Sequence, residues 1–198
     1  MSFRKEKKYR LTYSELLIIK KNLIQSGMNS LYPARIINSC YFDTHDLKLF
    51  SESEEGVLPR KKVRIRWYNK QNNFTKEVKI SSIEGRFKYQ KKINIQKFED
   101  LSNLRIFDKL YGELTPILNV SYEREYFSYK SLRLTFDKNI TYTFLKSISK
   151  PVFNDNECVM EIKVPINCNE NYIEKLIHLP TTRFSKYTRG CFLNYRKN

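Results

Sequence analysis

The sequence is poor in glycine and in the residues that build metal sites. It contains only 5 glycines in 198 residues, against 14 tyrosines and 13 phenylalanines, and this balance favours strands over loops. The four cysteines form no C-x-x-C pair, and the two histidines, His45 and His178, lie far apart in the chain. These features argue against a zinc site. We instead expect reduced, buried thiols, as in a cytosolic protein.

Long apolar runs and linkers are also missing. The longest purely aliphatic run covers residues 16–19 (LLII), far short of a membrane span. Residues 1–10 lack the apolar core of a signal peptide. No repeat, low-complexity segment or Pro/Gly/Ser-rich linker divides the chain. We therefore expect a cytoplasmic protein with a single domain over residues 1–198 and no membrane segment of its own.

Charge is abundant and mostly of one sign. The chain has 37 Lys and Arg residues against 21 Asp and Glu residues, a formal net charge of +16. So large an excess indicates a polyanionic partner: nucleic acid, nucleotide, polyphosphate or an anionic membrane surface. The alternative is a protein that is merely basic, which the strand-like spacing of the positive charges disfavours.

Charged and apolar residues alternate in several segments. In residues 62–67 (KVRIRW) a cation occupies every second position, and charges recur at the same spacing in residues 4–11, 76–80, 132–138 and 160–165. Successive residues of a strand point to opposite faces. One such strand is more often a solvated face of a sheet, but several together predict a shared charged surface.

The elements expected from these patterns form an α+β protein. Thr12 and Glu15 fit a capping box that opens a helix, and Gly27 ends it. We expect strands at residues 4–11, 36–42, 60–69, 74–80, 86–94, 117–129, 131–137 and 157–165, and further helices at 46–53, 95–110 and 169–178. Many strands without a βαβ rhythm predict an antiparallel sheet that closes into a barrel. With the apolar residues packed against outer helices, the charges would point into the lumen.

A lumen lined by like charges needs a compensating ligand, because buried charges cost several kcal/mol each. Polyphosphate fits, since Arg offers forked hydrogen bonds and Lys a point charge. The few carboxylates would then hold a divalent cation. Alternatively, Glu77 and Glu161 are only cross-strand partners of nearby lysines. Arg124 shares its parity with Tyr122 and Tyr126, which indicates either a bulge or a position at the rim.

The order of several short motifs resembles a known family. The motifs are R-x-E-x-K-Y at residues 4–9, S-C-Y-F-D-T at 39–44, K-V-R-I-R-W-Y at 62–68, E-V-K at 77–79, Y-E-R at 122–124, L-R-L-T-F-D at 132–137, M-E-I-K at 160–163 and S-K-Y at 185–187. From residue 4 to residue 190 the chain resembles the catalytic domain of the vacuolar transporter chaperone proteins. These are polyphosphate polymerases of the triphosphate tunnel metalloenzyme superfamily.

The resemblance implies a tunnel of about eight antiparallel strands, with a few helices packed outside and a C-terminal plug helix. Its basic lining would grip the triphosphate of a nucleotide. Together with the alternation pattern, it gives three groups of candidate residues: Arg64, Arg66, Lys79, Arg124 and Lys186 for catalysis; Lys8, Lys62, Lys88, Arg133, Lys163 and Ser185 for substrate binding; Glu161 and Glu6 for Mn²⁺ or Mg²⁺.

The chain also departs from the family pattern. Arg4 stands where the wider superfamily has the first of two glutamates, which argues against a two-metal triphosphatase and fits the polymerase branch. The spacing around residues 85–92 (GRFKYQKK) leaves the roles of Lys88, Lys91 and Lys92 ambiguous. Without a membrane segment, coupling to transport would require a separate membrane partner.

The function predicted from this resemblance is a metal-dependent polyphosphate polymerase that transfers the γ-phosphate of ATP to inorganic polyphosphate. One alternative is a tripolyphosphatase or nucleoside triphosphatase on the same tunnel. Another is a non-catalytic module that binds polyanions. Nucleic acid is not expected as the partner, because the aromatic residues alternate away from the charges.

Overall fold

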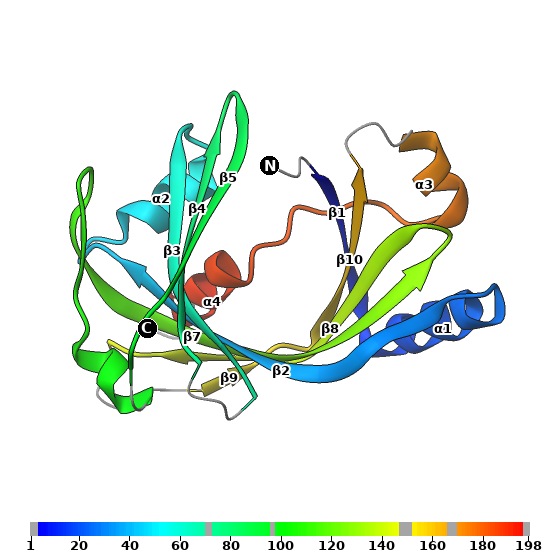
Figure 1. Ribbon diagram of the computed structural model, residues 1–198, viewed down its shortest axis with the longest axis horizontal. Coiled ribbons are helices and arrows are strands. Elements are labelled where there is room, and N and C mark those ends of the chain that lie inside the picture. Colours follow the sequence, from blue (N-terminus) through cyan, green and yellow to red (C-terminus); the bar gives the residue numbers. More distant parts are fainter. Residues whose placement is uncertain (1–3, 70–72, 96–97, 147–151, 166–169, 196–198) are drawn as a thin grey trace. The chain divides into compact units, whose positions relative to one another are not determined.

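The computed structural model describes residues 4–69, 73–95, 98–146, 152–165 and 170–195. It is an α+β structure of ten strands and four α-helices (Figure 1). The elements are β1 (Arg4–Thr12), α1 (Tyr13–Gln25), β2 (Asn29–Asp43), α2 (Lys48–Glu55), β3 (Arg60–Tyr68), β4 (Thr75–Ser82), β5 (Gly85–Lys92), the 3-10 helix η1 (Phe98–Asn103), β6 (Ile106–Asp108), β7 (Gly112–Tyr129), β8 (Leu132–Phe144), β9 (Val152–Asn154), β10 (Glu157–Pro165), α3 (Glu170–Leu176) and α4 (Lys186–Tyr195). Within the described ranges, no helix is both long enough and apolar enough to cross a bilayer.

The strands are hydrogen-bonded in the order β1-β10-β8-β7-β2-β3-β4-β5, with β6 beside β7 and β9 beside β8. The strand registers that are resolved are antiparallel, which confirms the expected antiparallel sheet. The order has β1 and β5 at its two ends. No register that would join these strands and close the predicted barrel is found among the described residues.

Several predicted boundaries were wrong. β7 begins at Gly112 rather than at residue 117, and β8 continues to Phe144 rather than ending at residue 137. β2 begins at Asn29 rather than at residue 36. The prediction missed its first residues because they are all exposed and show no apolar alternation. The expected helix over residues 95–110 is replaced by η1 and strand β6. Ile106 of β6 pairs with Leu114 of β7, and both side chains are buried. This tertiary pairing decides the conformation of a segment whose own pattern is ambiguous.

The chain divides into two compact units. Unit 1 consists of Met1–Arg35, Tyr122–Ile140 and Asp155–Phe184, and unit 2 consists of Ile36–Ser121, Thr141–Asn154 and Ser185–Asn198. Three long strands, β2, β7 and β8, contribute residues to both.

Unit 1 has an apolar core between helix α1 and strands β1, β8 and β10 (Figure 1). Thr12 and Glu15 form the predicted capping box, with Thr12 N–H donating to Glu15 Oε2 at 2.7 Å. Gly27 ends the helical region with a φ of +99°, a conformation that glycine adopts without strain. On β1, Tyr9 and Leu11 point into this core. Their neighbours of opposite parity therefore lie on the other face of the sheet.

Unit 2 has its own core, in which Val63, Ile65 and Trp67 of β3 cluster with buried residues of helix α2 and of η1. This confirms that the apolar partners of the β3 cations pack against helices. Helix α4 belongs to the same unit. A Cβ atom on Gly190 of α4 would lie 2.5 Å from a methyl group of Leu118, so glycine allows this close approach.

Three of the four cysteines have the buried thiols, without disulfides, that the sequence predicted. Cys40, Cys158 and Cys191 are free and buried. Cys168 lies outside the described residues.

Candidate functional site

The charged face of unit 2 is built by strands β2 to β5 in register. Residues directly opposite each other across an antiparallel pair point to the same face. Three rows therefore share this face: Tyr41, Arg64, Glu77 and Gln90; Ser39, Arg66, Thr75 and Lys92; and Lys62, Lys79 and Lys88. We call these residues the unit 2 charged face. It carries six cations and one carboxylate.

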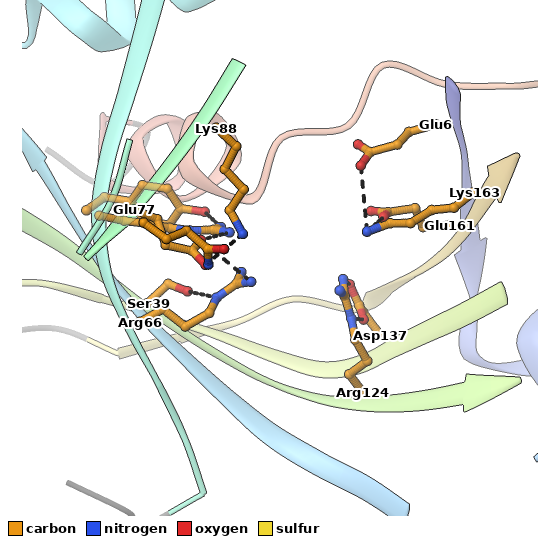
Figure 2. Close-up of polar contacts among 12 residues, drawn as sticks. Glu6, Ser39, Arg66, Glu77, Lys88, Arg124, Asp137, Glu161 and Lys163 are labelled. Atoms are coloured by element: carbon orange, nitrogen blue, oxygen red, sulfur yellow. Dashed lines mark hydrogen bonds and ion pairs between the residues drawn. The ribbon is translucent and has the colours of Figure 1, made fainter. Parts of the chain in front are cut away.

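That carboxylate, Glu77, is the centre of the unit 2 charged face (Figure 2). Its side chain is 1% exposed. Arg64 donates to Glu77 Oε2 from Nε at 2.8 Å and from Nη2 at 2.6 Å, while Lys88 Nζ lies 2.9 Å from Oε1. Gln90 donates to Oε1 at 2.6 Å. Glu77 therefore pairs with cations of both neighbouring strands, which are two arginines, Arg64 and Arg66, and one lysine, Lys88.

The protonation state of Glu77 follows from this environment. Burial by itself raises the pKa of Glu77, but the Arg64 and Arg66 guanidiniums outweigh that effect and hold the pKa well below its usual range. Glu77 is therefore ionised at any physiological pH. It offsets part of the repulsion among the surrounding cations.

Helix α4 is tied to the unit 2 charged face by two contacts near its start. Tyr187 stacks on Tyr41 with ring centroids 4.9 Å apart, and the Tyr41 hydroxyl accepts a hydrogen bond from Arg64 Nη1 at 2.9 Å. Lys62 Nζ donates to Ser185 Oγ at 2.8 Å. These contacts place the start of α4 beside basic residues of β3 within unit 2.

Asp43 anchors the two α-helices of unit 2, α2 and α4. It is fully buried, accepts the backbone N–H groups of Leu49 and Phe50 at 2.9 Å each, and accepts a short hydrogen bond from the Tyr187 hydroxyl. The first two bonds satisfy amide groups at the start of α2. The third fixes Tyr187 of α4.

The charged face of unit 1 is assembled in the same way from β1, β10 and β8. One row contains Glu6, Lys163 and Arg133, and the next contains Lys8, Glu161 and Thr135. Arg124 of β7 reaches this face through its bond to Asp137 of β8. We call these eight residues the unit 1 charged face.

Two predicted metal ligands meet on this face (Figure 2). Lys163 Nζ lies 3.3 Å from Glu161 Oε1 and 3.7 Å from Glu6 Oε1, so both carboxylates approach a single cation. Burial tends to raise the pKa of Glu161, but Arg124, Lys8 and Lys163 together lower it to about 2. Glu161 is therefore available as an anionic ligand.

The Arg124–Asp137 pair explains the parity of Arg124. Arg124 Nε and Nη2 donate to the two Asp137 carboxylate oxygens at 2.5 and 2.7 Å, and Asp137 is fully buried. The guanidinium also lies 5.3 Å from the Tyr122 ring centroid. Phe127 and Tyr129 belong to the apolar core, so residues of even number here lie on the charged face. Arg124 is 11% exposed, and neither a bulge nor a position at the rim is required.

A divalent ion bound with substrate fits this donor set. No group of three or more His, Cys, Asp or Glu side chains that suits a metal occurs in the described part of the chain. Mg²⁺, however, commonly uses one or two carboxylates and completes its shell with water and phosphate oxygens. Glu161 and Glu6 supply two carboxylates. Thr135 Oγ1, in the same row as Glu161, is buried without a hydrogen-bond partner in the described structure.

The remaining predicted residues have varied surroundings. Lys8 Nζ donates to the backbone carbonyl of Phe184 at 2.8 Å. Lys79 is exposed and pairs across the strands with two other lysines. Lys186 is the half-buried first residue of α4. Arg133 is exposed and lies 5.9 Å from the ring centroids of two tyrosines.

Sequence reasoning did not assign several residues that the structure brings to these faces. Glu77 and Asp137 stood in recognised motifs, but their role became visible only from the arginines that they contact. Tyr41 and Asp43 belong to the S-C-Y-F-D-T motif, which lacks the alternation of charged and apolar residues that marked the cations of β3. Thr135 had no signal beyond its parity.

Solved structures with this fold come from several organisms. A candidate adenylate cyclase from Bacillus halodurans has 17% identity and a TM-score of 0.56, covering 92% of this chain and 95% of its own. A Pyrococcus horikoshii protein has 16% identity and a TM-score of 0.55, covering 98% of this chain and all of its own. A candidate adenylyl cyclase from Hippeastrum, described as having a dominant triphosphatase activity, has 15% identity and a TM-score of 0.55, covering 94% of this chain and 95% of its own. At these identities the likeness establishes the fold.

The family follows from the sequence itself. No curated protein sequence matches the chain. A family model described as the VTC domain matches residues 3–195, and this range includes both charged faces. The chain therefore belongs to the VTC domain family.

Proposed function

We propose that the protein is a metal-dependent polyphosphate polymerase that transfers the γ-phosphate of ATP to a growing polyphosphate chain. The observation that carries the proposal is the unit 2 charged face, which carries six cations and one carboxylate. Such an excess of positive charge on a partly buried surface suits a ligand with closely spaced negative charges. Membership of the VTC domain family agrees with a phosphate-chain ligand.

In this proposal residues 1–198 act as a single domain of the triphosphate tunnel type. Arg64, Arg66 and Lys79 bind phosphate oxygens. Arg124 and Lys186 bind oxygens of the reacting phosphate groups. The other substrate contacts come from Lys8, Lys62, Lys88, Arg133, Lys163 and Ser185. Any coupling to transport uses a separate membrane partner, and the reaction takes place in the cytoplasm.

The chemistry is a direct phosphoryl transfer. An oxygen of the terminal phosphate of the chain attacks the γ-phosphorus of ATP, the bond from that phosphorus to the β,γ-bridging oxygen breaks, and ADP leaves with the electron pair. Bound Mn²⁺ or Mg²⁺ would neutralise charge on the transferring phosphoryl group. Glu161 and Glu6 would hold the ion, with Lys163 displaced from between them. No protein nucleophile is needed, because positioning and charge neutralisation provide most of the catalysis.

A hydrolase on the same site is the second candidate. The triphosphatase activity described for the structurally similar Hippeastrum protein favours it. Water would then replace the terminal phosphate as the attacking group. A module that binds polyphosphate without turnover is the third candidate.

Incubation of the purified protein with ATP and Mn²⁺, with products separated by length on a polyacrylamide gel, tests the proposal. We expect a ladder of long chains that is absent from an Arg64→Ala/Arg66→Ala variant. Orthophosphate without a ladder would establish the hydrolase instead. Triphosphate binding without either product would establish the binding module.

A further inference from the structure

A cluster of two tyrosines and two arginines lies on unit 1. Tyr32 comes from the first part of β2, the segment that begins earlier than predicted, and its ring meets Tyr126 of β7 edge to face at 5.9 Å. The Arg35 guanidinium lies 5.9 Å from the Tyr32 centroid and 5.8 Å from the Tyr126 centroid. The Arg133 guanidinium lies 5.9 Å from both. We call these four residues the tyrosine–arginine cluster.

The two arginines of this cluster differ from the other arginines of the charged faces. Arg64 and Arg124 each bond a buried carboxylate, and Arg66 lies 3.8 Å from one. Within the described residues, Arg35 and Arg133 have neither an ion pair nor a hydrogen bond, and their contacts are to the two rings. Two guanidiniums of the same charge thus share one pair of rings without a carboxylate between them.

The direct cross-strand partner of Arg133 is Lys163, a cation whose own ion pairs are with Glu6 and Glu161. Like charges directly opposite each other destabilise a strand pair. Arg133 and Arg35 are both exposed, as is about half of the Tyr32 side chain, so an anion can reach the guanidiniums from solvent.

The cluster continues the unit 1 charged face. Arg133 has the same parity on β8 as Thr135 and Asp137, opposite Leu132 and Leu134 of the core. It lies four positions before Asp137, the partner of Arg124, which corresponds to about 13 Å along the strand. A phosphate chain that contacts both Arg124 and Arg133 would therefore run along this face.

We propose that the tyrosine–arginine cluster is a second phosphate-chain subsite, which holds units of polyphosphate beyond the triphosphate bound near Arg124. The planar guanidinium fork matches the oxygens of a phosphate group, and two forks on one ring pair are already oriented by the rings. The identity of the anion as polyphosphate rests on the proposed function. The presence of an anion site rests on the four residues alone.

The test compares two ligands on one variant. Binding of tripolyphosphate and of long-chain polyphosphate is measured by calorimetry for the wild type and for Arg35→Ala. We expect long-chain affinity to fall about tenfold, as for the loss of one charged hydrogen-bonding group, and tripolyphosphate affinity to change less than twofold. Arg35→Lys should recover only part of the loss, because it restores the charge without the fork. Tyr32→Phe, which keeps the ring, should bind both ligands as the wild type does.

Arg105→Ala is the matched control, since it removes an exposed arginine of unit 2 that pairs only weakly with Glu113 at 3.4 Å. It should leave the ratio of the two affinities unchanged. Equal losses for Arg35→Ala and Arg105→Ala would overturn the subsite and indicate general charge attraction. A loss for ATP but not for long-chain polyphosphate would also overturn it, because the cluster would then contact the nucleoside. The assay needs no turnover, so it can succeed or fail independently of the polymerase activity.

Discussion

The two charged faces both bring several cations close together, but they differ in how many carboxylates offset the repulsion among these cations. On the unit 1 face, three carboxylates (Glu6, Asp137 and Glu161) accompany four cations. On the unit 2 face, Glu77 alone accompanies six cations. On each face the most buried carboxylate, Glu77 in unit 2 and Asp137 in unit 1, is bonded by an arginine from a neighbouring strand.

The difference indicates separate tasks. A nearly balanced face with two carboxylates near one cation suits a divalent ion and the phosphate that it binds. A face with a large excess of cations suits phosphate oxygens alone. Substitutions that act on one face and spare the other therefore test whether this division exists.

The largest effect is expected from removing the carboxylate of the more cationic face. Glu77→Gln leaves Arg64, Arg66 and Lys88 without their anionic partner, and should lower the free energy of unfolding by about 3–5 kcal/mol. Urea denaturation measures this loss. Added tripolyphosphate should raise the melting temperature of the variant more than that of the wild type, because phosphate replaces the missing charge.

Asp137→Asn is the counterpart on the unit 1 face and should cost about 3 kcal/mol, since it leaves one guanidinium, Arg124, unpaired. Glu174→Gln is the control, because the Glu174 side chain, which pairs with Lys7, is itself mostly exposed and should contribute less than about 1 kcal/mol. Equal stabilities for all three variants would contradict the view that these carboxylates hold the faces together.

The second effect concerns turnover. Glu161→Gln should reduce the rate of phosphoryl transfer about a hundredfold, the loss typical of one preorganised electrostatic group, and should raise the Mn²⁺ concentration needed for half-maximal activity. Steady-state rates over a range of Mn²⁺ concentrations measure both. Retention of wild-type rate and metal dependence would remove Glu161 from the metal site.

The third effect is a dependence of stability on pH. Burial raises the pKa of Glu161, but its cationic neighbours lower it further, to about 2. A carboxyl whose pKa is lower in the folded protein than in the unfolded chain stabilises the fold above the unfolded value, near 4.5. That contribution disappears as the pH falls from about 4.5 to about 2.

Urea denaturation at several pH values across this window provides the measurement. Glu161→Gln should flatten the decline in the free energy of unfolding. Part of the decline should persist in the variant, because the pKa of Glu77 on the other face is also lowered. An identical slope in the wild type and the variant would show that Glu161 is not ionised by its neighbours.

The smallest effects come from single hydroxyl groups. Tyr41→Phe removes the acceptor of the Arg64 hydrogen bond while keeping the ring that stacks on Tyr187, and should weaken tripolyphosphate binding about three- to tenfold. Thr135→Val, on the unit 1 face, removes a buried hydroxyl without a partner in the described structure. It should stabilise the free protein by about 1 kcal/mol. Calorimetric titration and urea denaturation distinguish these opposite outcomes.

Much of the fold followed from local pattern. The capping box at Thr12, the stop at Gly27 and the positions of most strands were predictable, because each depends on a few neighbouring residues. The beginning of β2 and the pairing of β6 were not. Exposed residues 29–35 show no apolar alternation, and Ile106 becomes a strand residue through its pairing with Leu114.

By itself, the sequence determined which side chains of each strand share a face, because the alternation of a strand is a local property of the backbone. It therefore placed Arg64 and Arg66 on one face of β3. The pairing of the strands then brought Glu77 to the same face as these arginines, and Glu161 to the same face as Lys8. Only the tertiary structure decided which carboxylate each cation contacts and which cations contact none. That outcome depends on register between strands distant in sequence, and it separates Arg124, bonded to Asp137, from Arg133, which lies against two tyrosine rings.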